Sequence, residues 1–235
     1  MNAQQILIYS DSLTWGIIPN TRQRLPFESR WPGVMECALL KSGEAVRVIE
    51  DCLNGRRTAF DDPFKPGRNG LVGFEQRIEV NSPLKLVILM LGTNDFQSMH
   101  SHNAWHAGQG IASLVDAIRR APIEPGMPFP EILIVAPPPA QEAKGPIAPK
   151  FAGAREKCVG LATAYEQVAR DHGCGFVDAG QFTTTSQVDG VHLDGDQHRV
   201  LGMAIADVVA SLLKTARTRG DASGNRNGQG TSASH

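Results

Sequence analysis

Two polar segments near opposite ends of the chain hold the residue types that acyl transfer requires. Ser12 follows an apolar run at residues 6–9, and Asp189 and His192 form a DxxH pattern late in the sequence. A serine hydroxyl becomes a good nucleophile when a base removes its proton, and a histidine can do this near neutral pH. A carboxylate fixes the histidine tautomer and stabilises the imidazolium as it forms. We therefore predict a catalytic triad of Ser12, His192 and Asp189.

Two further segments offer donors for the oxyanion that forms when a serine attacks an ester. Asn54 and Gly55 follow an apolar run at residues 46–50, and Asn94 lies in the Gly-Thr-Asn-Asp segment that follows residues 84–91. Backbone N–H groups and an asparagine side chain can both stabilise such an oxyanion. We predict that Gly55 and Asn94 serve this role.

Five short apolar runs must position these residues. They are rich in branched or aromatic residues, and turn-forming residues follow them, which is typical of buried strands. The runs lie at residues 6–9, 46–50, 84–91, 131–136 and 175–178. The third is almost continuously apolar, which indicates a central parallel strand covered on both faces.

Amphipathic patterns between these runs predict helices. Apolar residues recur at spacings of three and four over residues 104–120, 151–172 and 196–215, with Asp194 as a cap for the last helix. Alternation of strands and helices predicts a three-layer α/β/α sandwich, flavodoxin-like, with about five parallel strands. In such a sheet the groups that follow the strands gather at one edge, so the four polar segments should meet there.

These four segments resemble the sequence blocks of the SGNH (GDSL-type) hydrolase family. They read SDSLTWG, LNGRRT, LGTNDF and DGVH, in that order, between residues 9 and 192. The resemblance implies that Ser12 is the nucleophile and that Asp189 and His192 complete the triad. It also implies an oxyanion hole formed by the N–H groups of Ser12 and Gly55 and the side chain of Asn94. Ser10 stands where the family usually has glycine, and a small residue suits the end of a strand.

Further segments are similar to those of bacterial arylesterases that also act as acyltransferases and perhydrolases. These segments are DSLTWG, RWPG, LMLGTND, VAPPP and FVDAG. The resemblance implies short-chain acyl esters as substrates, a homo-oligomer that restricts the acyl pocket, and acyl transfer to alcohols or peroxide as a side activity.

Six residues flank the predicted site and could line a substrate pocket or pack as core. They are Asp11, Trp15, Ile17, Phe96, Val188 and Val191. Asp11 is also expected to order the nucleophile turn, and Asp95 to brace its loop. A carbohydrate acetylesterase would share the mechanism but would need a polar, open acceptor site. A non-catalytic binding module would lack a triad or oxyanion residue, and none is missing.

Composition limits the partners that we expect. The 235 residues carry a net charge of -1, without the basic face that nucleic acid or an anionic membrane would require. No apolar stretch reaches the roughly 18 residues of a membrane span, and no secretory signal is evident, so we expect a soluble cytoplasmic protein. We expect one domain at residues 1–217 and a disordered Gly/Ser/Asn-rich tail at 218–235.

No cofactor or metal is expected. The four cysteines are scattered without a CxxC pair, so we expect buried, reduced thiols. His100, His102 and His106 lack a nearby carboxylate or cysteine ligand set, and a solvated loop leading into a helix accounts for them better than a metal site does.

Overall fold

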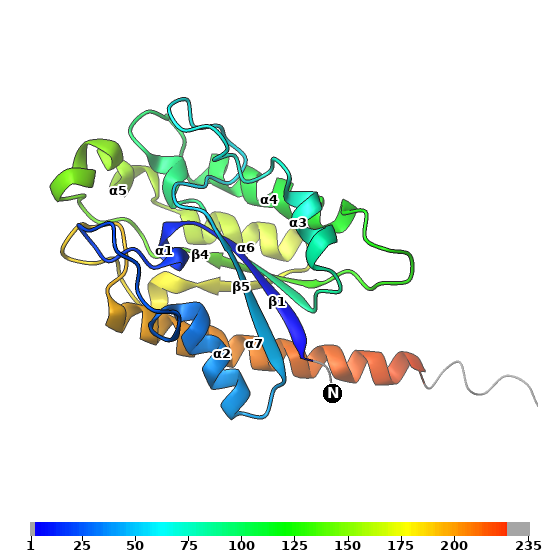
Figure 1. The fold of residues 1–235 in the computed structure, drawn as a ribbon. Helices are drawn as coiled ribbons and strands as arrows, with labels where there is room; N and C mark the ends of the chain where they lie inside the picture. Colours follow the sequence, from blue (N-terminus) through cyan, green and yellow to red (C-terminus); the bar gives the residue numbers. More distant parts are fainter. Residues whose placement is uncertain (1–2, 225–235) are drawn as a thin grey trace, which may run out of the picture.

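A five-stranded parallel sheet forms the centre of the molecule (Figure 1). The computed structural model describes residues 3–224. The strands are β1 (Gln4–Ser10), β2 (Val46–Cys52), β3 (Leu86–Met90), β4 (Glu131–Ala136) and β5 (Gly175–Asp178). Their order in the sheet is β2-β1-β3-β4-β5, which confirms the predicted flavodoxin-like fold. The order reverses between β1 and β3, where open α/β sheets usually bind ligands.

The central strands are buried on both faces, as the apolar run at residues 84–91 predicted. All five residues of β3 are buried, and β1 pairs with it from Ile6 opposite Leu86 to Ser10 opposite Met90. Alternate side chains of a strand point to opposite faces. Leu7 and Leu89 accordingly join one apolar core, whereas Ile6 and Ile88 join the other.

Helices cover both faces of the sheet and complete the three layers (Figure 1). Helices α2 (Trp31–Lys41) and α7 (Gly195–Gly224) pack on one face. Helices α3 (Phe74–Asn81), α4 (Ala104–Arg120) and α6 (Leu161–Asp171) pack on the other. Helix α4 matches its predicted bounds, whereas α2 and α3 were not predicted. Both have weaker periodic patterns than α4, so their burial depends more on tertiary packing.

The predicted helix at residues 151–172 is wrong as a single element. The chain forms a 3₁₀ segment (Gly145–Phe151), a short α5 (Ala154–Lys157) and then α6. Gly153 and Gly160 have φ values of 74° and 84° and precede α5 and α6, so the backbone turns at these two positions.

The last helix is longer than predicted. It begins at Gly195 and continues to Gly224, beyond the expected end at residue 215. The first residues of the predicted tail, 218–224, are therefore helical, and residues 225–235 lie outside the described residues. Alanine and arginine residues after position 215 favour continuation of a helix.

The cysteines and histidines differ in part from expectation. All four cysteines are free thiols, but Cys158 alone is buried and Cys37 is exposed. The rings of His100, His102 and His106 are stacked rather than solvated, with centroids 4.7 and 5.3 Å apart along the series. His106 also takes part in the capping box that begins α4. Burial and then the neighbouring histidines lower the pKa of His102 to about 4.

Within residues 3–224, no helix combines the length and the apolar character needed to cross a lipid bilayer.

Candidate active site

The nucleophile turn connects β1 to a single helical turn, α1 (Ser12–Trp15). Ser12 is the first residue of this turn and is 6% exposed. The Asp11 side chain accepts a hydrogen bond from the Leu13 N–H at 2.9 Å, so Asp11 orders the turn as expected. Gly16 ends it with a φ of 83°, where a side chain would strain the backbone. Ser12 thus lies at the carboxyl edge of the sheet.

Ser10 fits its position without strain. It is the last residue of β1, and its φ is not in the left-handed region. Its hydroxyl donates to the Met90 carbonyl at 2.5 Å and lies 2.6 Å from the Thr14 hydroxyl. Trp31 donates to the same Thr14 oxygen at 3.0 Å. Ser10 therefore ties the nucleophile turn to β3, a role that a glycine could not fill.

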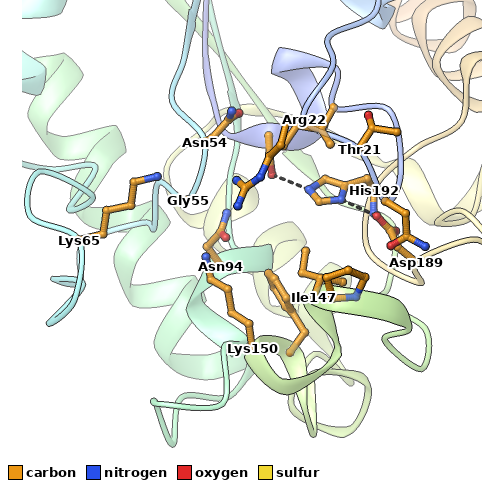
Figure 2. A pocket seen from close by; sticks show the side chains of 15 residues that line it. Thr21, Arg22, Asn54, Gly55, Lys65, Asn94, Ile147, Lys150, Asp189 and His192 are labelled. Carbon is orange, nitrogen blue, oxygen red and sulfur yellow. Dashed lines mark hydrogen bonds and ion pairs between the residues drawn. The ribbon is translucent and has the colours of Figure 1, made fainter.

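The structure brings the three predicted triad residues together, and Figure 2 shows His192 beside Asp189. Nε2 of His192 lies 3.2 Å from Oγ of Ser12, and Nδ1 of His192 lies 2.7 Å from Oδ2 of Asp189. With Nδ1 donating to the carboxylate, Nε2 is free to accept the serine proton. These contacts join residues 180 positions apart in the sequence.

The DxxH segment holds its own carboxylate in place. Oδ1 of Asp189 accepts the N–H groups of Val191 and His192, both at 2.9 Å. Burial raises the pKa of Asp189, but the hydrogen bonds and charge of His192 and these N–H donors outweigh burial, so the pKa lies below its usual value. The carboxylate is thus ionised at neutral pH. Gly190 has a φ of 78°, and a Cβ there would collide with the Glu142 carbonyl.

Gly55 and Asn94 lie beside Ser12 in the same cavity. Gly55 sits in the turn after β2 with a φ of 87°, and its N–H donates to no acceptor within residues 3–224. Such an unpaired N–H at a cavity is free to meet an oxyanion. Asn94 is almost fully buried, in the 3₁₀ turn (Thr93–Phe96) that follows β3.

The Asn94 side chain is held by partners on both sides. Its Nδ2 donates to Oδ2 of Asp11 at 2.9 Å and to the Arg56 carbonyl at 3.2 Å. Its Oδ1 accepts from Gln97 at 2.7 Å, which fixes the orientation of the amide. Both amide hydrogens are therefore engaged, and Asn94 must share or release one of them to donate to an oxyanion.

The two aspartates beside the site are buried and have raised pKa values. Burial raises the pKa of Asp11 to about 6, although the Leu13 N–H, His192 and Asn94 oppose this effect. Burial likewise raises the pKa of Asp95 to about 7. Asp95 accepts the Thr58 hydroxyl at 2.6 Å and the Thr58 N–H at 2.9 Å. It thus braces the loop that follows Gly55.

A cavity of about 410 Å³ lies over Ser12. Of the six residues considered as pocket, only Ile17 lines it. Asp11, Phe96 and Val191 are buried, which corrects that part of the expectation. Trp15, the last residue of α1, and Val188, in the segment between β5 and α7, lie outside the lining. No cluster of histidine, cysteine or acidic side chains among residues 3–224 has the arrangement of a metal site.

Comparison with known proteins decides the family. The model of the GDSL-like Lipase/Acylhydrolase family matches residues 11–200. This chain belongs to that family. It is accordingly an acylhydrolase, and the matched span contains all five residues predicted for the triad and the oxyanion hole.

Two solved structures share the fold of most of this chain. A carbohydrate acetylesterase from Sinorhizobium meliloti is 35% identical, with a TM-score of 0.84 over 89% of this chain and 99% of that chain. The M. smegmatis aryl esterase in its inhibitor-bound form is 34% identical, with a TM-score of 0.84 over 89% of this chain and 100% of that chain.

A sequence relative covers less of the chain. An arylesterase from Vibrio mimicus is 31% identical over 93 residues, which are 40% of this chain and 38% of that protein. The match thus spans well under half of that protein's length.

Sequence reasoning missed most of the cavity wall of this acylhydrolase. Arg22 and Lys65 line it from two loops and Lys150 from the 3₁₀ segment before α5, together with polar residues such as Asn20 and Asn54. Charged residues in loops are usually solvated, so nothing in the sequence marks these three. Only the folded chain shows that they meet.

Proposed function

We propose that the chain is a serine esterase that hydrolyses short-chain acyl esters of aryl or alkyl alcohols through an acyl-serine intermediate. One observation carries the proposal. Ser12, His192 and Asp189 form a continuous hydrogen-bonded line at 3.2 and 2.7 Å on the wall of a cavity. This geometry can deprotonate a serine and return the proton to a leaving group.

The reaction proceeds in two halves. Oγ of Ser12 attacks the ester carbonyl while Nε2 of His192 takes its proton. The N–H groups of Ser12 and Gly55, and the Asn94 amide once it releases a partner, stabilise the oxyanion. His192 then protonates the leaving alcohol or phenol, and the C–O bond breaks. Water attacks the acyl-serine with His192 again as base, which releases the acid and restores Ser12. An alcohol or peroxide in place of water would give acyl transfer.

A carbohydrate acetylesterase is the second candidate, and the cavity wall favours it more than the sequence did. Asn20, Thr21 and Asn54 line the cavity. Of the apolar residues expected beside the site, Ile17 lines it, whereas Trp15 and Phe96 lie outside the lining. The likeness to the S. meliloti acetylesterase adds support. Such an enzyme would share the mechanism and differ in the alcohol that it recognises.

Turnover of a substrate series would test both candidates. We expect purified protein to hydrolyse phenyl acetate, with rates that fall for longer phenyl esters, and Ser12→Ala to be inactive. Ser10→Ala is a matched control, because Ser10 lies two residues away and does not contact His192. No turnover of any ester by the parent protein would overturn the proposal. A preference for acetylated xylose over phenyl acetate would favour the acetylesterase.

We further propose a homo-oligomer, on the basis of the resemblance to the arylesterase subgroup. Exposed apolar side chains such as Phe182 and Val188, in the segment between β5 and α7, are consistent with a covered surface. Light scattering coupled to size exclusion would measure the mass, and a monomer at micromolar concentration would overturn this part.

A further inference from the structure

Three cationic side chains converge on the cavity that contains Ser12 (Figure 2). Arg22 comes from the loop after α1, Lys65 from the loop between β2 and α3, and Lys150 from the 3₁₀ segment before α5. In Figure 2 their charged ends point toward the space beside Gly55 and Asn94. Residues far apart in sequence thus place three positive charges at one opening.

No acidic side chain balances these charges. Within residues 3–224, none of the three makes an ion pair, and Asp189 is the one acidic residue that lines the cavity. Asp189 is already engaged by His192 at 2.7 Å. The charge of Asp62 influences the pKa of Lys150, but the Asp62 carboxylate is already paired with the buried Arg57 at 2.8 Å. The cavity therefore presents excess positive charge.

The titration of Lys150 is consistent with this surplus. Loss of solvent around its half-buried side chain lowers its pKa, and the positive charges of Arg57, Lys65 and Arg22 lower it further, against the opposing effect of Asp62. Like charges around one space repel each other, and an anion between them would relieve that repulsion.

We propose that this cavity selects esters that carry a second, negatively charged group, such as a carboxylate, near the scissile carbonyl. The proposal rests on the proposed esterase function and narrows its substrate class. The leaving oxygen must face His192 to receive a proton, and the cations lie beside Gly55 and Asn94, away from Asp189 (Figure 2). The negative charge can lie on the acyl chain or on the alcohol portion, because both kinds of ester carry a second, anionic group.

Pairs of esters that are matched in size but differ in charge measure the preference for an anionic group. Monophenyl glutarate and its neutral primary amide place the charge on the acyl side. The 4-acetoxybenzoate anion and 4-acetoxybenzamide place it on the alcohol side. We expect kcat/KM to favour the anionic member by roughly tenfold in at least one pair, and the pair that responds identifies the side.

Variants show whether the three cations cause the preference. Lys150→Gln and Lys65→Gln should each reduce the anionic-to-neutral ratio by roughly threefold, and the triple variant with Arg22→Gln should bring it close to one. Lys41→Gln is the matched control. Lys41 is exposed at the end of α2, next to the amino end of β2 and so at the opposite edge of the sheet. The ratio is the readout, since these charges also act on the oxyanion of any ester.

The outcomes separate this inference from the proposed function. Turnover of phenyl acetate with ratios near one in both pairs would overturn the anionic preference and leave the esterase intact. The proposal would also be overturned if the triple variant kept the anionic-to-neutral ratio of the parent protein. If the parent turns over no ester, binding of 4-acetoxybenzoate and 4-acetoxybenzamide to Ser12→Ala protein by calorimetry tests recognition directly, and equal affinities would overturn it.

Discussion

The two sides of the cavity are built on different principles. On the His192 side, Asp189 is buried, and both of its oxygens accept hydrogen bonds from the DxxH segment. On the other side, Arg22 and Lys65 come from loops and Lys150 from a 3₁₀ segment, and none makes an ion pair within the described residues. Buried, fully bonded groups hold a fixed geometry, whereas unpaired charges at an opening act on whatever ligand arrives. We therefore propose that the reaction takes place on the first side and that the second side selects the substrate.

A change to one hydrogen bond on the triad side should cause the largest loss of activity. Asp189→Asn keeps the size of the side chain but removes the charge that fixes the His192 tautomer. We expect kcat for phenyl acetate to fall on the order of 10⁴-fold, with little change in unfolding temperature. Asp196→Asn is a control at an exposed position in the first turn of α7. A loss below tenfold would show that Asp189 does not orient the base.

Asn94 lies where the two sides meet, and its replacement should have the next largest effect. We expect Asn94→Ala to lower kcat by roughly 10² to 10³ with KM nearly unchanged, because the lost donor acts in the transition state. Thermal unfolding would check that loss of the bonds to Asp11 and Gln97 has not loosened the site. An unchanged kcat would mean that the amide stays bonded to Asp11 throughout the reaction.

Added salt should affect the two sides of the cavity differently, with a smaller change in activity than the substitutions above. Raising NaCl from about 0.02 to 0.5 M screens exposed charges far more than buried ones. We expect kcat/KM for the preferred anionic ester to fall roughly fivefold, while that for phenyl acetate changes less than about twofold. Equal responses of the charged and neutral esters would remove the functional contrast between the two sides.

The smallest effect on activity is expected for a substitution at Ser10, which supports the nucleophile turn. Ser10→Gly restores the residue that the family usually has, but it removes hydroxyl bonds to Met90 and Thr14. We expect the free energy of unfolding in urea to drop by about 1 to 2 kcal/mol and kcat to stay within about twofold. Ser10→Ala separates the lost bonds from the added backbone freedom. A tenfold loss of kcat would show that Ser10 positions Ser12 and belongs to the reaction side.

Strands were more predictable than helices in this chain. The bounds expected for β4 and β5 match the structure, because their apolar runs are bounded by turn residues. Helix α4 also matches, since its apolar stripe is strong. The region after β4 was mispredicted as one helix, because its apolar spacing continues across Gly153 and Gly160 although the backbone turns at both. Periodicity alone does not reveal such breaks.

The sequence by itself determined the family, the layered fold and the residues that we propose for catalysis. Those residues follow strands, and the ends of parallel strands share one edge, so order along the chain was enough to bring Ser12, Asn94 and His192 into one neighbourhood.

Tertiary structure decided the contacts and the character of the cavity. Whether Phe96 and Val191 face the cavity or the core depends on a rotation of the backbone that no local pattern encodes, and both are buried. The meeting of Arg22, Lys65 and Lys150 depends on the paths of three separate connecting segments. Strand ends are placed by the sheet, but loop side chains are placed by packing across the whole fold, which is why the predicted catalytic residues were foreseen and the cationic wall was not.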